Sequence, residues 1–127
     1  MKLNKQDHEL VRLAQDLINK RHGKYSTVGV ALKTTVGKIF SGVNVEQIHA
    51  SPCSMCAEYS AIGQMQSDGD HTIETVIAIN SDDKVLPPCG KCREMMRQFG
   101  NPYVILNKDH KYFKLRLEEL IPHWELE

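Results

Sequence analysis

Hydrophobic residues recur along the first third of the chain at two periods, one typical of a helix and one typical of strands. Apolar side chains three and four positions apart predict an amphipathic helix over residues 5–22, ended by Gly23. Residues 28–35 and 38–45 instead alternate with a period of two and are rich in β-branched side chains, which predicts two strands. The turn between them falls at residues 35–38, so these strands are expected to form a hairpin.

The rest of the chain continues the alternation of helices and strands. A helix is expected from Ser51 to about Met65, and the near-continuous apolar run 73–79 predicts a strand buried on both faces. The remaining expected elements are a helix over 89–99, strands over 103–106 and 112–117, and a short closing helix at 120–121. This order predicts one domain over residues 1–127, an α/β sandwich built on a mixed sheet of five strands.

Composition and charge limit the classes of partner that this chain is expected to bind. Sixteen basic residues balance sixteen acidic ones, whereas a nucleic-acid binder usually carries a basic excess, so no nucleic-acid partner is expected. No apolar stretch approaches the roughly eighteen residues that a membrane span needs, so no membrane partner is expected either. The first residues show no apolar signal segment, and a cytoplasmic location is therefore the expectation.

All four cysteines lie in two Cys-x-x-Cys pairs, which in a cytosolic protein indicates metal or redox chemistry. Cys89 and Cys92 are three residues apart at the start of an expected helix, so their thiols share one face. Cys56 falls in the first turns of the preceding helix, and helix N-termini favour thiolates. Cys56, Cys89 and Cys92 are therefore the candidate zinc ligands, and Arg93 is a candidate for a nearby positive charge that stabilises them.

Three thiolates leave one of zinc's four tetrahedral positions open, which is typical of a catalytic site. Zinc lowers the pKa of water at such a position, so a hydrolytic reaction becomes accessible near neutral pH. Glu58 lies two residues after Cys56 and can reach that position without being a ligand. A carboxylate there can accept the proton of the water and deliver it to a substrate, which makes Glu58 the candidate catalytic residue.

These residues together resemble the signature of the cytidine deaminase family. The signature is Cys or His, any residue and Glu, followed later by Pro-Cys-x-x-Cys; here it is met by Cys56 and Glu58 and then by residues 88–92. Three further segments resemble the family in the same order, at residues 28–32, 37–46 and 119–122. The resemblance covers nearly the whole chain.

The resemblance implies a fold, an activity and an assembly. The fold is a three-layer α/β/α sandwich, and the activity is zinc-dependent hydrolytic deamination of a cytosine nucleoside to its uracil form with release of ammonia. One Zn²⁺ ion is expected per subunit, in a homotetramer that takes part in pyrimidine salvage. The resemblance also implies that Asn44 and Glu46 hydrogen-bond the ribose hydroxyl, and that the backbone of Ala57 contacts the pyrimidine ring.

Three departures from the family pattern leave the substrate open. The Phe that usually precedes the segment at 28–32 is absent from residues 25–27. Tyr59 replaces the Arg that usually follows the catalytic Glu, and Glu94 replaces the Gln that usually follows the second cysteine pair and its Arg. Residues 25–44 and the absence of that Arg are closer to the blasticidin S deaminase branch, whereas Asn44 and Glu46 favour a ribonucleoside.

Three other interpretations compete with a nucleoside deaminase. With Cys53 as a fourth ligand, the cysteines would form a closed structural zinc site in a non-catalytic module. A dithiol redox protein would use one Cys-x-x-Cys pair and have no need of the second. A deaminase of polynucleotides would more often have His in place of Cys56 and would need a basic groove. Trp124 is a further candidate, either for packing against a neighbour or for covering the site.

Overall fold

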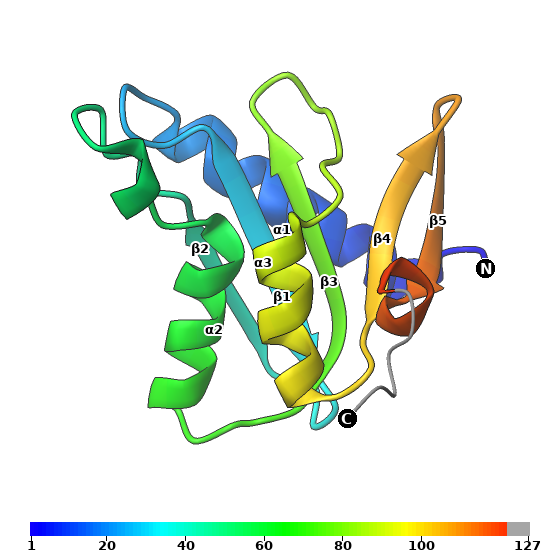
Figure 1. The fold of residues 1–127 in the computed structure, drawn as a ribbon. Coiled ribbons are helices and arrows are strands. Elements are labelled where there is room, and N and C mark those ends of the chain that lie inside the picture. The colour runs from blue at the N-terminus through cyan, green and yellow to red at the C-terminus, as the bar shows by residue number, and fades with distance from the viewer. Residues whose placement is uncertain (122–127) are drawn as a thin grey trace.

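The computed structural model describes residues 1–121, which fold around one sheet of five strands in the order β2-β1-β3-β4-β5 (Figure 1). The strands are β1 Val28–Thr34, β2 Ile39–Val43, β3 Ile73–Asn80, β4 Tyr103–Lys108 and β5 Lys111–Arg116. The pairing of β3 with β4 is parallel, and the other three pairings are antiparallel. The mixed five-stranded sheet is therefore confirmed, with β3 as the buried central strand.

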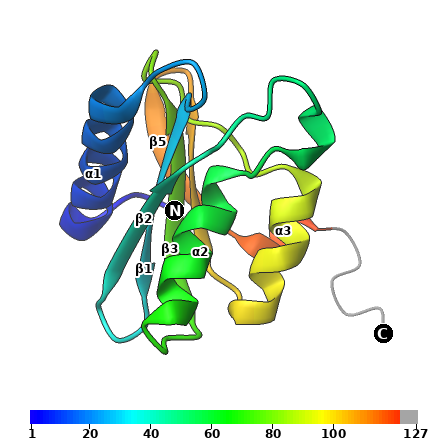
Figure 2. The ribbon, with the colours of Figure 1, turned by 90° about the vertical axis from the view of Figure 1, so that its left-hand side faces the viewer.

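Helices cover both faces of the sheet, so the three-layer α/β/α arrangement is also confirmed (Figure 2). Helix α1 Lys5–Arg21 lies on one face, and helices α2 Ala57–Ser67 and α3 Gly90–Met96 lie together on the other. Three short 3-10 helices complete the described chain: η1 Ser51–Cys53, η2 Arg97–Phe99 and η3 Leu117–Leu120. None of the helices within residues 1–121 is long and apolar enough to cross a membrane.

Each face of the sheet has its own hydrophobic core, because successive side chains of a strand point to opposite faces. The core under α1 includes Ala31, Ile77 and Ile79, and the core under α2 and α3 includes their neighbours Val30 and Ala78. Two glycines allow the helices to approach the strands closely. A Cβ atom at Gly29 would lie 2.7 Å from the carbonyl oxygen of Ala14 in α1, and one at Gly42 would lie 2.5 Å from Ser60 Oγ in α2.

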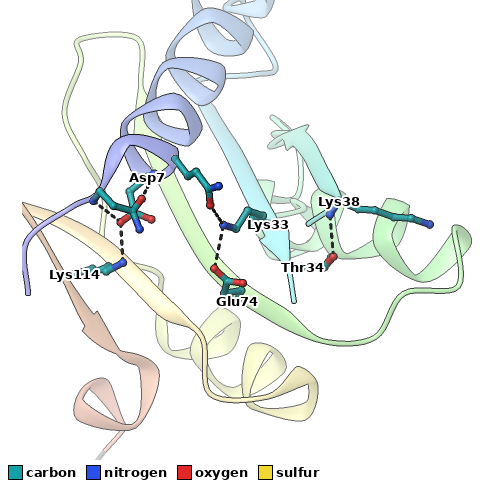
Figure 3. A network of polar contacts seen from close by, with 8 residues as sticks. Asp7, Lys33, Thr34, Lys38, Glu74 and Lys114 are labelled. Atoms are coloured by element: carbon teal, nitrogen blue, oxygen red, sulfur yellow. Dashed lines mark hydrogen bonds and ion pairs between the residues drawn. The ribbon is translucent and has the colours of Figure 1, made fainter. Parts of the chain in front are cut away.

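An ion pair buried under the start of α1 connects this helix to the last strand (Figure 3). The Nζ atom of Lys114 in β5 lies 2.7 Å from a carboxylate oxygen of Asp7, and both side chains are buried. The same carboxylate accepts the backbone N–H of Asn4, whose side chain in turn accepts the N–H of Asp7. This capping box fixes the first turn of α1 and the position of the carboxylate together.

The predicted boundaries need one correction that affects the site. The helix expected from Ser51 begins only at Ala57, and Ser51–Cys53 form a separate 3-10 turn. Between them the backbone is extended, and Met55 pairs antiparallel with Val45 through two hydrogen bonds of 2.9 Å. Cys56 is consequently the N-cap of α2 and does not lie within its first turns.

The second half of the fold needs smaller corrections. Helix α3 is shorter than expected, because residues 97–99 continue it as a 3-10 turn. The closing turn lies at residues 117–120 instead of 120–121. Trp124 and the end of the 119–122 segment lie outside the described residues.

One edge of the sheet gathers the chain segments that carry the candidate site residues. Strand β1 begins and strand β3 ends there, with Val28 opposite Asn80. Strand β2 ends at the same edge, since Val43 is opposite Gly29. Helices α2 and α3 both begin there as well (Figure 1). The topology thus brings together residues from positions 28, 44–58 and 89–92.

Candidate metal centre and active site

Three thiols from the starts of α2 and α3 form a group of the size that a zinc ion needs. Cys56 is the N-cap of α2, Cys89 is the N-cap of α3, and Cys92 lies in the first turn of α3. Their sulfur atoms all lie within 4.8 Å of one another, and those of Cys56 and Cys89 are 3.9 Å apart. Tetrahedral ligands with Zn–S bonds of ~2.3 Å have sulfur atoms roughly 3.8 Å apart, so this donor set fits Zn²⁺.

The surroundings of these thiols do not by themselves favour three thiolates. Burial raises the pKa of Cys92, and the nearby Glu58 carboxylate adds to this effect. Burial also raises the pKa of Cys56. At Cys89 burial acts in the same direction, but hydrogen bonds from the backbone and thiol of Cys92 and from the Cys56 thiol outweigh it and lower the pKa. A bound cation is what would hold all three groups in the thiolate form.

Cys53 does not join this group. It is exposed on η1, whereas the cluster of sulfur atoms comprises Cys56, Cys89 and Cys92. The closed four-cysteine zinc site is therefore not the arrangement that the structure describes. A zinc ion held by the three clustered thiols would keep one of its four positions free of protein ligands.

Glu58 lies beside the thiols as the second residue of α2 and is only 7% exposed. Burial raises the pKa of its carboxyl group, although hydrogen bonds from its own backbone N–H and from the Cys92 thiol partly oppose the shift. Within residues 1–121, no lysine, arginine or histidine lies in ion-pair distance of this carboxylate. Such a carboxyl group binds a proton more readily than an exposed one, which suits a proton carrier.

A cavity of about 220 Å³ adjoins the cluster. Its apolar walls come from Val28, Ala57, Ala78, Leu86 and Pro87. Its polar lining residues are Glu58, Cys56 and Cys89 near the helix starts, and Asn44, Glu46 and Ser54 from the segment between β2 and α2. Apolar walls with a few convergent polar groups are typical of a binding site for a small molecule. The structure thus brings Asn44, Glu46 and Ala57 to the same cavity as Glu58.

Asn44 and Glu46 are hydrogen-bonded to each other, with 3.1 Å between Asn44 Nδ2 and Glu46 Oε1. Ser54 completes this group, because its hydroxyl donates to Glu46 Oε2 at 3.3 Å. The sequence pattern did not single out Ser54, since a serine near a helix start is most often a cap. Only the pairing of Val45 with Met55 places it opposite Glu46, and that pairing follows from the extended backbone at 54–56.

Arg93 is bonded to two backbone carbonyl oxygens. Its Nε donates to the oxygen of Pro88 at 2.8 Å, and its Nη1 donates to the oxygen of Leu120 at 2.9 Å. The guanidinium therefore connects the loop before Cys89 to the end of the described chain. Its expected action on the thiolates stays a prediction. Tyr59, which replaces the family's usual Arg, has the Nζ of Lys91 located 4.7 Å from its ring centre.

Comparisons with known proteins agree with this geometry. The family model described as the cytidine and deoxycytidylate deaminase zinc-binding region matches residues 4–108. Blasticidin-S deaminase of Bacillus cereus is 34% identical over 94% of this chain and 92% of its own length. A probable cytidine deaminase of Dictyostelium discoideum is 36% identical over 86% of this chain and 76% of its own length.

Solved structures extend the agreement to the fold. The cytidine deaminase of Burkholderia pseudomallei aligns with a TM-score of 0.77 at 25% identity, over 95% of this chain and 98% of that one. The cytidine deaminase of Bacillus anthracis aligns with a TM-score of 0.81 at 24% identity, over 94% of this chain and 90% of that one, which shows the shared fold. With the matched zinc-binding region and the clustered thiols, these likenesses lead to one conclusion: the chain belongs to the family of zinc-binding cytidine and deoxycytidylate deaminases.

Proposed function

We propose that this protein removes the exocyclic amine of a free cytosine nucleoside by hydrolysis and releases the uracil form and ammonia. The observation that carries the proposal is the grouping of three thiols of zinc-binding geometry with the buried carboxyl of Glu58 at one cavity. The donor set leaves room for a reacting group, and the carboxyl group stands beside it. Membership of the deaminase family supports the same reaction.

The cavity walls suit a flat heteroaromatic ring. Val28, Leu86 and Ala57 offer apolar surface to the ring faces, and Ala57 also begins α2, where backbone N–H groups are not used within the helix. We propose that the start of α2 orients the polar edge of the ring through these groups. A cytosine ring that packs against these apolar walls excludes bulk water from the reacting carbon.

Glu58 is the proposed proton carrier. Zinc, held by Cys56, Cys89 and Cys92, would supply the Lewis acid that lets water react near neutral pH. Glu58 accepts a proton from the reacting water and delivers it to N3 of the cytosine ring, so that the carbon at position 4 can be attacked. The carboxyl group then moves the remaining proton of the added water to the departing amine, which leaves as ammonia. In the metal-free chain, burial raises the pKa of Glu58, which favours the protonated carboxyl group.

The proposed assembly and setting follow from the family resemblance alone. We propose a homotetramer in the cytoplasm that takes part in pyrimidine salvage. Light scattering on the zinc-loaded protein should give four times the chain mass of 14.4 kDa. A mass equal to a single chain would contradict the proposed tetramer without affecting the proposed reaction.

Ammonia release from a panel of cytosine compounds tests the proposed function. Zinc-loaded protein should release ammonia from cytidine or deoxycytidine, with the uracil nucleoside as co-product. Glu9→Gln, an exposed change on α1, should leave this turnover intact. No ammonia from either nucleoside, with one zinc bound per chain, would refute the proposed substrate class.

Blasticidin S is the second candidate substrate. It is favoured by the 34% identity to blasticidin-S deaminase over nearly the whole chain and by Tyr59 in place of the usual Arg. The same assay separates the two candidates. Ammonia from blasticidin S alone would keep Glu58 and the thiols in their proposed roles and would replace the nucleoside as substrate.

A further inference from the structure

The polar groups of Asn44 are all used within the protein. Its Oδ1 accepts the backbone N–H groups of Thr27 at 2.7 Å and Val28 at 2.9 Å. Its Nδ2 donates to Thr27 Oγ1 at 3.2 Å and to Glu46 Oε1 at 3.1 Å. An amide offers two acceptor sites and two donor hydrogens, so in the ligand-free chain all the sites of this side chain, which is 6% exposed, are occupied.

The main chain of Asn44 is equally committed. Its N–H donates to the carbonyl oxygen of Val28 at 3.2 Å, and its carbonyl oxygen accepts the hydroxyl of Ser26 at 2.8 Å. The residue therefore connects the end of β2 to the chain that enters β1. The main chain of Asn44 thus has a structural role.

The pairing of Val45 with Met55 determines which side chains stand next to each other. In an antiparallel pair the neighbouring positions are also opposite, so 46 faces 54 and 44 faces 56. Side chains at 44 and 46 lie on the face opposite to that of residue 45. The segment that carries Glu46 is thus attached directly to the segment that carries Cys56.

The hydroxyl hydrogen of Ser54 is donated to Glu46. Ser54 Oγ accepts the backbone N–H of Gln47 at 2.9 Å, which orients the oxygen and leaves its hydrogen to donate. Its partner is Glu46 Oε2 at 3.3 Å, while Glu46 Oε1 is held by Asn44. The carboxylate is therefore held at both oxygens, from two different segments of the chain.

Glu46 nevertheless keeps capacity for a ligand. A carboxylate accepts about four hydrogen bonds, and the two from Asn44 and Ser54 leave the rest. The residue is exposed and lines the cavity together with Ser54. It is the member of the group that can accept a hydroxyl of the substrate.

We propose that Ser54 is a positioning residue that aims the Glu46 carboxylate at a sugar hydroxyl, while Asn44 holds the other oxygen of this carboxylate. This inference rests on the proposed function, because it assumes that the cavity takes a cytosine nucleoside. It adds Ser54 to the expected pair of Asn44 and Glu46. Specificity for the sugar then depends on one carboxylate and on its two internal donors.

Calorimetry with two nucleosides tests the proposal. Zinc-loaded Glu58→Gln protein, whose turnover is expected to be about 10²–10⁴-fold slower, is titrated with cytidine and with 2′,3′-dideoxycytidine. Removing the Ser54 hydroxyl by Ser54→Ala should weaken cytidine binding about tenfold and leave 2′,3′-dideoxycytidine binding unchanged. Ser54→Thr, which keeps a hydroxyl, should restore cytidine binding. Ser51→Ala, an exposed serine of η1 three residues away, is the matched control and should change neither affinity.

The remaining outcomes overturn the inference. An equal loss for both nucleosides would assign Ser54 a general structural role, and no loss for cytidine would show that Glu46 needs no second donor. Failure of cytidine to bind would contradict the proposal that the cavity takes a cytosine nucleoside. If the wild-type protein releases no ammonia from cytidine while the hydroxyl-dependent loss is still observed, the proposed function fails and the role of Ser54 stands.

Discussion

The two faces of the sheet both bury acidic side chains, but they treat them differently. Under α1, Asp7 is 3% exposed and has Lys114 at 2.7 Å and the N–H of Asn4 at 3.0 Å. Under α2 and α3, Glu58 is 7% exposed, and within residues 1–121 no cationic side chain lies in ion-pair distance. It stands beside three thiols whose own thiolate forms would add further negative charge.

This contrast distinguishes a structural charge from a functional one. An isolated buried charge is costly, and the chain offsets that cost at Asp7 with a partner of its own. At Glu58 and the thiols the positive charge is left to zinc, whose double positive charge offsets part of the negative charge of the thiolates. The face under α1 therefore pairs its buried carboxylate within the chain, whereas the opposite face depends on zinc.

The largest effect is expected from removing a buried thiol. Cys92→Ala should release most of the bound zinc and abolish ammonia production, because two thiols do not retain the ion firmly. Zinc content by atomic emission and ammonia release measure both consequences. Cys53→Ser should leave both quantities as in the wild type, since Cys53 lies outside the cluster. Comparable loss in both variants would favour the four-cysteine structural site.

Breaking the ion pair on the other face should affect stability and leave the chemistry intact. Lys114→Met leaves Asp7 buried without its partner, which should lower the free energy of unfolding by about 3–5 kcal/mol. Lys38→Met removes an exposed pair, Lys38–Asp68 at 2.8 Å, and should cost about 0–1 kcal/mol. Urea denaturation of the two variants gives this difference. Ammonia release per folded Lys114→Met molecule should match the wild type, and a large drop would mean that the two faces are not independent.

A smaller effect is expected from the pH dependence of the zinc-free protein. Burial raises the pKa of Glu58 above its ordinary value of 4.5, so the folded chain holds this proton more tightly than the unfolded chain. The resulting contribution to stability is fully present below pH 4.5 and is lost as the pH rises through the folded-state pKa. Chelated wild-type protein should show this loss in urea titrations over that window, and chelated Glu58→Gln should not. Identical profiles for the two proteins would contradict the burial effect at Glu58.

The sequence was sufficient for the fold and for the chemistry of the metal site. Period-two alternation located β1 and β2, and a near-continuous apolar run located β3, which is buried on both faces. Cys56, Glu58, Cys89 and Cys92 could be chosen because their residue types and spacing are specific to one kind of site. The start of α2 was misplaced, since Pro52 and Ser54 resemble a helix start, whereas the backbone there is extended and pairs with Val45.

Contacts between distant segments were beyond the reach of the sequence. Asp7 and Lys114 are 107 positions apart, and each resembles an ordinary surface charge in its local pattern. The residues next to Ser54 do not indicate its role. The sequence around Asn44 is also the same whether its side chain binds a substrate or holds the chain before β1. Their roles depend on hydrogen bonds that exist only after β1, β2 and the 54–56 segment are assembled.

Ammonia release by zinc-loaded Glu58→Gln, beside Glu9→Gln as the matched exposed change, tests the central claim most directly. The claim is that the buried carboxyl group of Glu58 moves protons in the reaction. At equal zinc content, Glu58→Gln should lower kcat by about 10²–10⁴-fold, and Glu9→Gln should not change it. Full turnover by Glu58→Gln with zinc retained would contradict the account, because the reaction would then need no proton transfer by this carboxyl group.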